Sequence, residues 1–242
     1  MGVIARGIVE GDAAYAAEWL FTDRCDGVSA GDYSSLNVGA SVGDDPDAVA
    51  ANRAIIAGYL GADALALVRQ VHGRDVARLA EPAAVPPDAD AVITDVPGLP
   101  IAVQTADCVP ILLADLLDGQ VSAVHAGWRG VVADVVGAAL DELAPRGPVH
   151  AWIGPAICPA CYEVSEEVRA EVCAVAPAAF ARTRTGTPAV DVRAGVAQQL
   201  RERGIDAQLV GGCTFEEPGL YSFRRDAVTG RQAGVIVLRE RP

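Results

Sequence analysis

ADAVITDVPGLPIAVQTADCVPILLADLLDGQVSAVHAG, residues 89–127, consists of short runs rich in Val and Ile that are separated by turn signals. Pro-Gly, Asp-Cys-Val-Pro and Asp-Gly lie between the runs and are typical of turns. The pattern predicts at least four strands. Residues 127–143, GWRGVVADVVGAALDEL, then place apolar side chains at helical spacing and predict a helix that begins at Trp128–Gly130. Strands followed at once by a helix indicate a mixed α/β fold.

Three segments outside this stretch carry helix signatures. In residues 41–61, SVGDDPDAVAANRAIIAGYLG, Asp45 suits the N-cap, Pro46 the first turn and Gly61 the exit. Arg53 lies between apolar neighbours of this helix, so we expect its guanidinium along the core-facing edge. The other two helices are residues 164–177, capped by Ser165, and residues 191–204, capped by Asp191 and ended by Gly204.

The remaining apolar runs predict strands. Residues 64–80, ALALVRQVHGRDVARLA, alternate well enough for a pair of strands with a turn at Gly73–Arg74. Residues 149–157 predict a strand and a turn, and residues 233–240 predict the last strand. No internal repeat or linker divides the chain, so we expect a single domain that spans residues 1–242.

The bulk composition excludes several classes of protein. The 242 residues are 51% hydrophobic, which is enough for a core without disulfides. The net charge is −13, and all 19 basic residues are Arg, so the chain has no lysine for a Schiff base or a phosphate loop. Nucleic acid is a poor partner for so acidic a chain. Arginine is the only fixed cation available to anionic substrates, and no obligatory protein partner is evident.

Neither a secretory signal nor a membrane span is evident in the sequence. The first residues lack a positive region followed by an unbroken apolar core. The longest apolar stretches are far shorter than the roughly 20 residues that cross a bilayer. We therefore expect a cytoplasmic protein without membrane contact. Its six cysteines are then expected to be buried thiols, metal ligands or nucleophiles rather than disulfides.

Three side chains at the ends of predicted strands form a candidate metal site. His72, Cys108 and His125 each close an apolar run and are followed by a turn signal. Strand ends are where α/β proteins assemble their sites. Two imidazoles and a thiolate suit Zn²⁺, and three protein ligands leave the fourth position open, as in catalytic sites. The alternative is that all three are ordinary buried residues, because Cys is among the most buried residue types.

Other motifs carry weaker signals. Arg129 lies in the strand-to-helix junction HAGWRG, where backbone N–H groups and a cation suit an anion. Arg224 belongs to an arginine pair that suits phosphate or ordinary surface ion pairs. Cys158 and Cys161 form a CxxC without a second CxxC, which leaves a redox or zinc role open. The cytidine-deaminase signature is absent, since Ile157 precedes Cys158 and no histidine is followed by x-Glu.

Taken together, the motifs resemble the YfiH family, a group labelled multicopper polyphenol oxidoreductases ("laccase domain") and later assigned purine nucleoside chemistry. The resemblance rests on SLNVG…NR, QVHG, DADAVIT…TADCVPILLAD, HAGWRG, IGPAI…CYEVSEEV and CTF…SFRRD…GRQA, in that order from about residue 20 to the C-terminus. One departure lies at CPAC, where relatives commonly have Gly-Pro-Cys-Cys-Tyr and this chain keeps only the second cysteine, Cys161.

The resemblance implies a fold, a metal and an activity. The fold is a layered α-β-β-α sandwich with mixed sheets, distantly shared with toxin deamidases. The zinc ligands are His72, Cys108 and His125. The implied activities are phosphorolysis of adenosine, inosine, guanosine and methylthioadenosine, and hydrolytic deamination of adenosine. The family's turn asparagine falls on Asn37, and its NR pair includes Arg53.

From these assignments we expect purine nucleosides and phosphate as substrates. Asp107, beside the cysteine ligand, is the candidate proton shuttle, although it also suits a chain turn. The candidate substrate and phosphate contacts are Asn37, Arg129, Arg224 and Arg53, which we also place among the catalytic residues. Three alternatives stay open: a metal-free cysteine hydrolase with Cys108 as nucleophile and His125 as base, a copper-dependent polyphenol oxidase, and a binding module without catalysis. Copper is the less expected metal, because three histidines cannot hold a multinuclear cluster.

Overall fold

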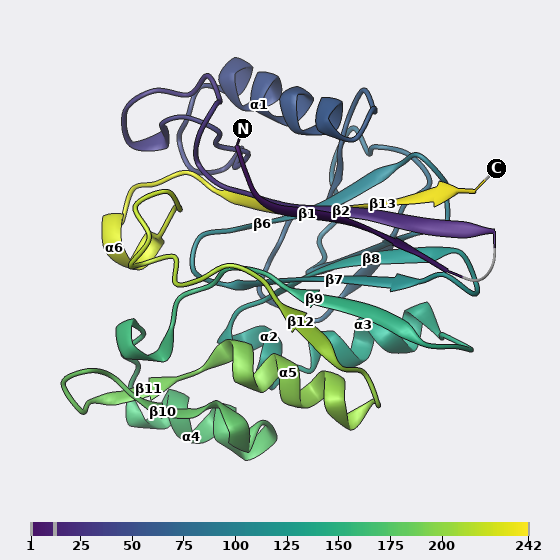
Figure 1. The fold of residues 1–242 in the computed structure, drawn as a ribbon. Coiled ribbons are helices and arrows are strands. Elements are labelled where there is room, and N and C mark those ends of the chain that lie inside the picture. The colour runs from purple at the N-terminus through teal and green to yellow at the C-terminus, as the bar shows by residue number, and fades with distance from the viewer. Residues whose placement is uncertain (1, 12–13, 242) are drawn as a thin grey trace.

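Two large β-sheets lie face to face, and helices cover the outer face of each (Figure 1). This computed structural model describes residues 2–11 and 14–241. Both sheets mix parallel and antiparallel pairs. The first sheet has the order β1 (Val3–Glu10), β2 (Tyr15–Thr22), β13 (Gln232–Glu240), β6 (Pro100–Thr105) and β3 (Ala66–Leu67). The second has the order β12 (Ala207–Leu209), β9 (Val149–Ile153), β7 (Val109–Asp115), β8 (Gln120–Ala126), β5 (Ala91–Thr94) and β4 (Val76–Arg78).

The helices divide between the two outer faces. Helix α1 (Pro46–Tyr59) covers the first sheet. The second sheet is covered by α2 (Trp128–Val132), α3 (Val135–Leu143) and α5 (Val192–Glu202), and α4 (Glu166–Val175) packs against α2 farther from the sheet. Short elements complete the chain: η1 (Gly31–Tyr33), η2 (Pro159–Cys161), η3 (Pro177–Ala179), the pair β10 (Phe180–Arg182) and β11 (Pro188–Val190), and α6 (Phe223–Asp226). The predicted α-β-β-α sandwich with mixed sheets is confirmed.

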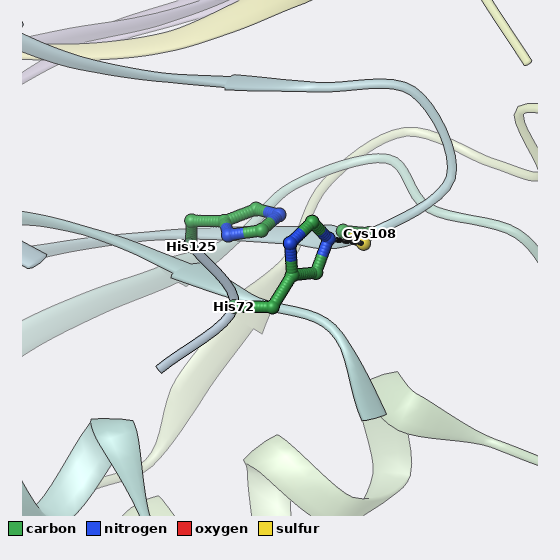
Figure 2. Close-up of side chains that lie close together, drawn as sticks. All are labelled: His72, Cys108 and His125. Carbon is green, nitrogen blue, oxygen red and sulfur yellow. Dashed lines mark hydrogen bonds between the residues drawn. The ribbon is translucent and has the colours of Figure 1, made fainter. Parts of the chain in front are cut away.

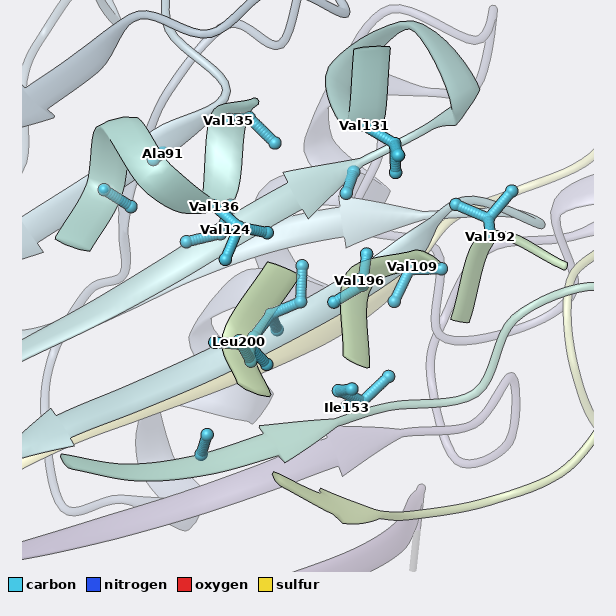
Figure 3. Close-up of a cluster of buried hydrophobic side chains, with 14 of the residues drawn as sticks. Ala91, Val109, Val124, Val131, Val135, Val136, Ile153, Val192, Val196 and Leu200 are labelled. Atoms are coloured by element: carbon cyan, nitrogen blue, oxygen red, sulfur yellow. The ribbon is translucent and has the colours of Figure 1, made fainter. Parts of the chain in front are cut away.

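Burial on both faces explains why the central strands are almost continuously apolar. Along β7, Ile111 and Leu113 face the helices, whereas Leu112 faces the other sheet. Every residue of β7 is buried, as expected for a strand covered on two sides. Figure 3 shows the core on the helix side, where Val136 and Leu200 pack over the sheet.

Most predicted elements are confirmed, with two differences. The four strands of residues 89–127 are β5 to β8, and the predicted caps Asp45, Ser165 and Asp191 each accept a hydrogen bond at their helix N-terminus. The helix predicted from residue 128 is two helices, because Asp134 has a left-handed φ of 58° and caps α3 through Gly137 N.

The second difference concerns residues 64–80. The two predicted strands exist as β3 and β4, but they lie in different sheets, so the chain crosses between the layers through the segment that carries His72. Strands β1 and β2 were not predicted. Among the described residues, no helix combines the length and the apolar character needed to cross a bilayer.

Candidate active site

His72, Cys108 and His125 converge at one end of the second sheet (Figure 2). Their ligand atoms all lie within 4.8 Å of one another. Strand pairing causes this, because His125 on β8 is in register with Pro110 on β7, two residues after Cys108. The two imidazole rings are edge to face with centroids 4.9 Å apart, and His72 Nε2 lies 3.9 Å from Cys108 Sγ. The three residues predicted as metal ligands are thus brought together.

A buried carboxylate orients both histidines. Asp90 is fully buried, and its Oδ1 lies 2.8 Å from His125 Nδ1. The same carboxylate accepts hydrogen bonds from the backbone N–H groups of His72 and Gly73, at 3.0 and 2.6 Å. His72 adopts a left-handed φ of 61° there, and such strain is typical of functional sites. With Nδ1 engaged, His125 turns Nε2 toward the other ligand atoms, which is the usual arrangement around a metal-bound histidine.

The side chains of Cys108 and His125 also shift each other's pKa values. Burial alone would raise the pKa of the Cys108 thiol, but His125 and His72 lower it to about 6. Burial alone would lower the pKa of His125, but the Cys108 thiolate and Asp90 raise it to about 9. At neutral pH the cluster therefore favours a thiolate beside an imidazolium.

The donor set fits a metal ion. Two imidazole nitrogens and a sulfur suit Zn²⁺, and they also suit a single copper ion. Space for an ion depends on Gly127, since a Cβ there would lie 3.1 Å from Cys108 Sγ and 3.2 Å from His72 Cδ2. Three ligands on one side leave the fourth direction toward a cavity, so the residues could hold a metal with an open coordination position.

The cavity beside these ligands has a volume of about 750 Å³. Its walls come from both sheets and from the loops around α1 and α6. Its lining includes five arginines and three aromatic residues. The arginines are Arg53, Arg69, Arg129, Arg224 and Arg231, and the aromatic residues are Trp128, Tyr162 and Phe223. A chain with a net charge of −13 therefore concentrates positive charge at this one cavity.

The three arginines predicted to contact substrate all line the cavity. Nε and Nη2 of Arg53 donate to the carbonyl of Val38, at 2.9 and 2.7 Å. The guanidinium carbon of Arg129 lies 4.5 Å from the centroid of the Trp128 ring. Arg224 lies over the Tyr162 ring. The cations are thus held in place before a ligand binds, which reduces the entropy lost on binding.

Asp107 and Asn37 occupy different positions relative to the cavity. Asp107 lines it with a left-handed φ of 90°. Its two carboxylate oxygens accept hydrogen bonds from Thr214 Oγ1 and the Arg224 backbone N–H, both at 2.6 Å. Asn37 is fully buried behind the wall, where its Oδ1 accepts from Gly39 N and Arg231 N. Asn37 therefore connects the loop before α1 to the start of β13.

Sequence reasoning missed two residues of this region. Asp90 begins the run DAVIT, and the pairing of β5 with β8 places it against His125. Arg231 lines the cavity directly before β13, and both carbonyls of Thr229 and Gly230 accept from its Nη1. The signal for each was its position directly before a strand, whereas the histidines and Cys108 were marked by the ends of apolar runs.

Comparisons with known proteins give consistent results. A family described as multi-copper polyphenol oxidoreductase laccase matches residues 18–239. The purine nucleoside phosphorylase SCO2081 of Streptomyces coelicolor is 50% identical over 236 residues, covering 94% of this chain and 98% of the relative. The purine nucleoside phosphorylase YfiH of Shigella flexneri is 41% identical over 223 residues, covering 89% and 91%. The crystal structure of Bacillus licheniformis hypothetical protein YfiH superimposes with a TM-score of 0.85 at 27% identity, covering 93% and 97%.

Proposed function

The chain belongs to the YfiH family, whose family model carries the description multi-copper polyphenol oxidoreductase laccase, and from this premise we propose that it is a zinc-dependent purine nucleoside enzyme. Its reactions are phosphorolysis of adenosine, inosine, guanosine and methylthioadenosine, and hydrolytic deamination of adenosine. The observation that carries the proposal is one cavity that joins a two-nitrogen, one-sulfur ligand set to fixed arginines and aromatic rings.

In this proposal His72, Cys108 and His125 hold the zinc ion. A zinc ion bound there supplies a Lewis acid at the cavity wall. Asp90 keeps His125 in the tautomer that presents Nε2 and fixes the backbone of His72. The protein thereby holds its ligands in place before a substrate enters the cavity.

The rest of the cavity suits a purine nucleoside and phosphate. The rings of Tyr162 and Phe223 offer faces on which a purine stacks. Arg53, Arg129 and Arg224 bind phosphate through paired N–H groups. In phosphorolysis a phosphate oxygen forms a bond to C1′ as the C1′–N bond breaks, and the base leaves with a proton. The arginines then neutralise the anion that approaches the sugar.

Asp107 is the proposed proton carrier for deamination, in which water replaces the amino group at C6 and ammonia leaves. It is an acidic side chain of the wall next to Cys108. Its hydrogen bonds to Thr214 and to the Arg224 backbone hold the carboxylate in one orientation. Conversion to Asn keeps these acceptor contacts in part and removes the titratable group, so Asp107→Asn should reduce inosine formation more than it alters Tm.

The test is a chromatographic assay on protein of measured metal content, incubated with adenosine in the presence or absence of phosphate. Adenine that forms only with phosphate, or inosine that forms without it, supports the proposal if Cys108→Ala abolishes both. Cys25→Ala is the matched control, because Cys25 is exposed and lies outside the cavity lining. Zinc-loaded protein that yields neither product contradicts the proposal.

A metal-free cysteine hydrolase is the second candidate. The specific observation in its favour is that Cys108 Sγ lies within 4.8 Å of a His125 ring nitrogen and that His125 Nδ1 lies 2.8 Å from Asp90 Oδ1, an order that matches a nucleophile, a base and an orienting acid. If the protein is such a hydrolase, its activity survives dialysis against a chelator. Iodoacetamide then inactivates the metal-free protein by alkylating Cys108. Activity that is lost on chelation and returns with zinc excludes this candidate.

The family description raises the question of a multinuclear copper oxidase. The chain contains three histidines, and the third, His150, lies on β9 stacked against Trp152. The ligand set of the cavity thus suits one ion, whereas multicopper oxidases need many histidines. An absorption spectrum of copper-loaded protein with and without a phenol substrate tests for this activity directly.

A further inference from the structure

A second group of cysteines gathers outside the cavity. The sulfurs of Cys158, Cys161 and Cys213 all lie within 4.8 Å of one another. None of the three lines the cavity. Cys213 is buried, and the other two are half-buried. Half of the chain's six cysteines are therefore concentrated at one point that the proposed reactions do not use.

Backbone pairing between two loops creates this cluster. Ala156 and Cys213 form a parallel bridge, in which Ala156 N donates to Gly212 O and Thr214 N donates to Ala156 O. The turn of η2 then brings Cys161 back over Cys158, since Cys161 N donates to Cys158 O at 3.0 Å. Two segments 55 residues apart thus present three sulfurs to a common centre.

Two further contacts are typical of a metal–thiolate site. The backbone N–H of Cys158 donates to Cys213 Sγ at 3.2 Å, and such bonds stabilise a thiolate. The carboxylate of Glu216 lies 3.6 Å from Cys161 Sγ. With Zn–S of about 2.3 Å and Zn–O of about 2.1 Å, tetrahedral geometry separates a sulfur from an oxygen by roughly 3.6 Å. Glu216 Oε1 is therefore at the distance from Cys161 Sγ expected of a fourth ligand, and a shift of its exposed side chain is needed to bring it equally close to the other two sulfurs.

The surroundings balance the charge of such a site. Arg184 forms an ion pair with Glu216. Arg193 donates to the carbonyl of Gly211, in the loop that carries Cys213. Three thiolates and a carboxylate around Zn²⁺ leave two negative charges, and these two cations lie beside them.

We propose that Cys158, Cys161, Cys213 and Glu216 form a second, structural zinc site. Binding displaces three thiol protons and forms three Zn–S bonds and one Zn–O bond, with no change of oxidation state. All four positions are filled by protein, so the site has no place for substrate.

This site braces the cavity wall from behind. Thr214 follows Cys213 and donates to Asp107, and Ile157 N donates to the Asp107 carbonyl at 3.0 Å. Tyr162 follows Cys161 and lines the cavity. Zinc that joins the two loops would thus hold Asp107 and Tyr162 in position, whichever reaction the cavity carries out.

The test is metal analysis with Cys108→Ala as the background, because that change removes the only sulfur among the three ligands at the cavity. We expect about two equivalents of zinc per chain in the unmodified protein, one in Cys108→Ala and none in the Cys108→Ala/Cys213→Ser double variant. Replacement of zinc by Co²⁺ in Cys108→Ala should give intense sulfur-to-cobalt absorption, which only thiolate ligands produce. Cys173→Ser in the same background is the control, since Cys173 lies on α4 outside the cluster.

A second readout separates metal from disulfide. In Cys108→Ala with zinc, Cys158 and Cys161 should resist iodoacetamide until a chelator is added, and Tm should fall by at least about 5 °C on zinc removal. If Cys108→Ala is found to bind no zinc and its cobalt-treated form shows no thiolate–cobalt absorption, the proposal is overturned. This result holds even if the double variant fails to fold. An intact mass lower by two hydrogens, with Cys158 joined to Cys161, would overturn it in favour of a disulfide.

Discussion

The two cysteine-containing clusters of this molecule differ in their ligand atoms and in the structure that surrounds them. The first combines two nitrogens with one sulfur at strand ends, is oriented by the buried Asp90 and faces a cavity of about 750 Å³. The second combines three sulfurs on two loops behind the cavity wall. An open set of three ligands suits catalysis, whereas a closed set suits structure. The difference teaches that the surroundings of a ligand set, more than its residue types, indicate its role.

The largest expected effect is a loss of catalytic activity when the first cluster, but not the second, is disrupted. Cys108→Ala should reduce kcat/KM by a factor of about 1,000 or more, equivalent to about 4 kcal/mol of transition-state stabilisation, and change Tm little. Cys213→Ser should lower Tm and reduce kcat/KM by about tenfold or less, because it acts through the wall. Steady-state kinetics and thermal unfolding of both variants measure this contrast. Equal losses of activity would remove the distinction between the clusters.

The next prediction concerns the support of the first cluster. Asp90→Asn should weaken zinc binding by about 10- to 100-fold, because the hydrogen bond to His125 Nδ1 loses its charge. Competition with a chromophoric chelator measures the affinity. Asp88→Asn is the matched control, since Asp88 is two residues earlier and forms an ion pair with Arg69. If both variants bind zinc as the unmodified protein does, Asp90 does not position the ligands.

The arginines at the cavity beside the first cluster predict a selective effect on phosphate binding. Arg129→Met should raise the KM for phosphate by about tenfold, because a fixed cation stacked on Trp128 is lost. Phosphorolysis should therefore fall more than deamination. Arg146→Met is the control, because Arg146 is exposed and pairs with Asp118. A loss of both activities to the same degree would mean that Arg129 supports the cavity rather than phosphate.

The smallest expected effect tests the space for the metal. Gly127→Ala should weaken zinc binding by a few-fold, because the new Cβ crowds Cys108 Sγ and His72 Cδ2 at 3.1 and 3.2 Å. The φ of Gly127 is −82°, so the backbone tolerates alanine. Gly58→Ala in α1 is the control, since a Cβ there meets nothing within 4 Å, and it should stabilise the protein by about 1 kcal/mol. Unchanged zinc affinity in Gly127→Ala would show that the ligands adjust freely.

Local patterns predicted most elements because local forces determine them. The caps Asp45, Ser165 and Asp191 act on N–H groups two or three residues away, which a sequence displays directly. The break at Asp134 was missed, because the apolar spacing continues across it and only the backbone conformation reveals it. The separation of β3 and β4 into two sheets was missed for a related reason. Alternation predicts a strand but does not identify its partner. The single-domain organisation stays a prediction.

Within the candidate site, sequence by itself determined the ligand types of the first cluster and three arginines that the structure places at the cavity, in part through a family resemblance. The roles assigned to these residues stay predictions. Only the tertiary structure decided that Asp90 contacts His125, that Arg231 lines the cavity, and that Cys213 joins the CxxC motif. Each of these contacts joins residues far apart in the chain, and its formation depends on strand register and loop pairing. Register and loop pairing are decided when the two sheets pack together and bury their apolar faces. That packing involves distant segments, so no short stretch of sequence reveals it.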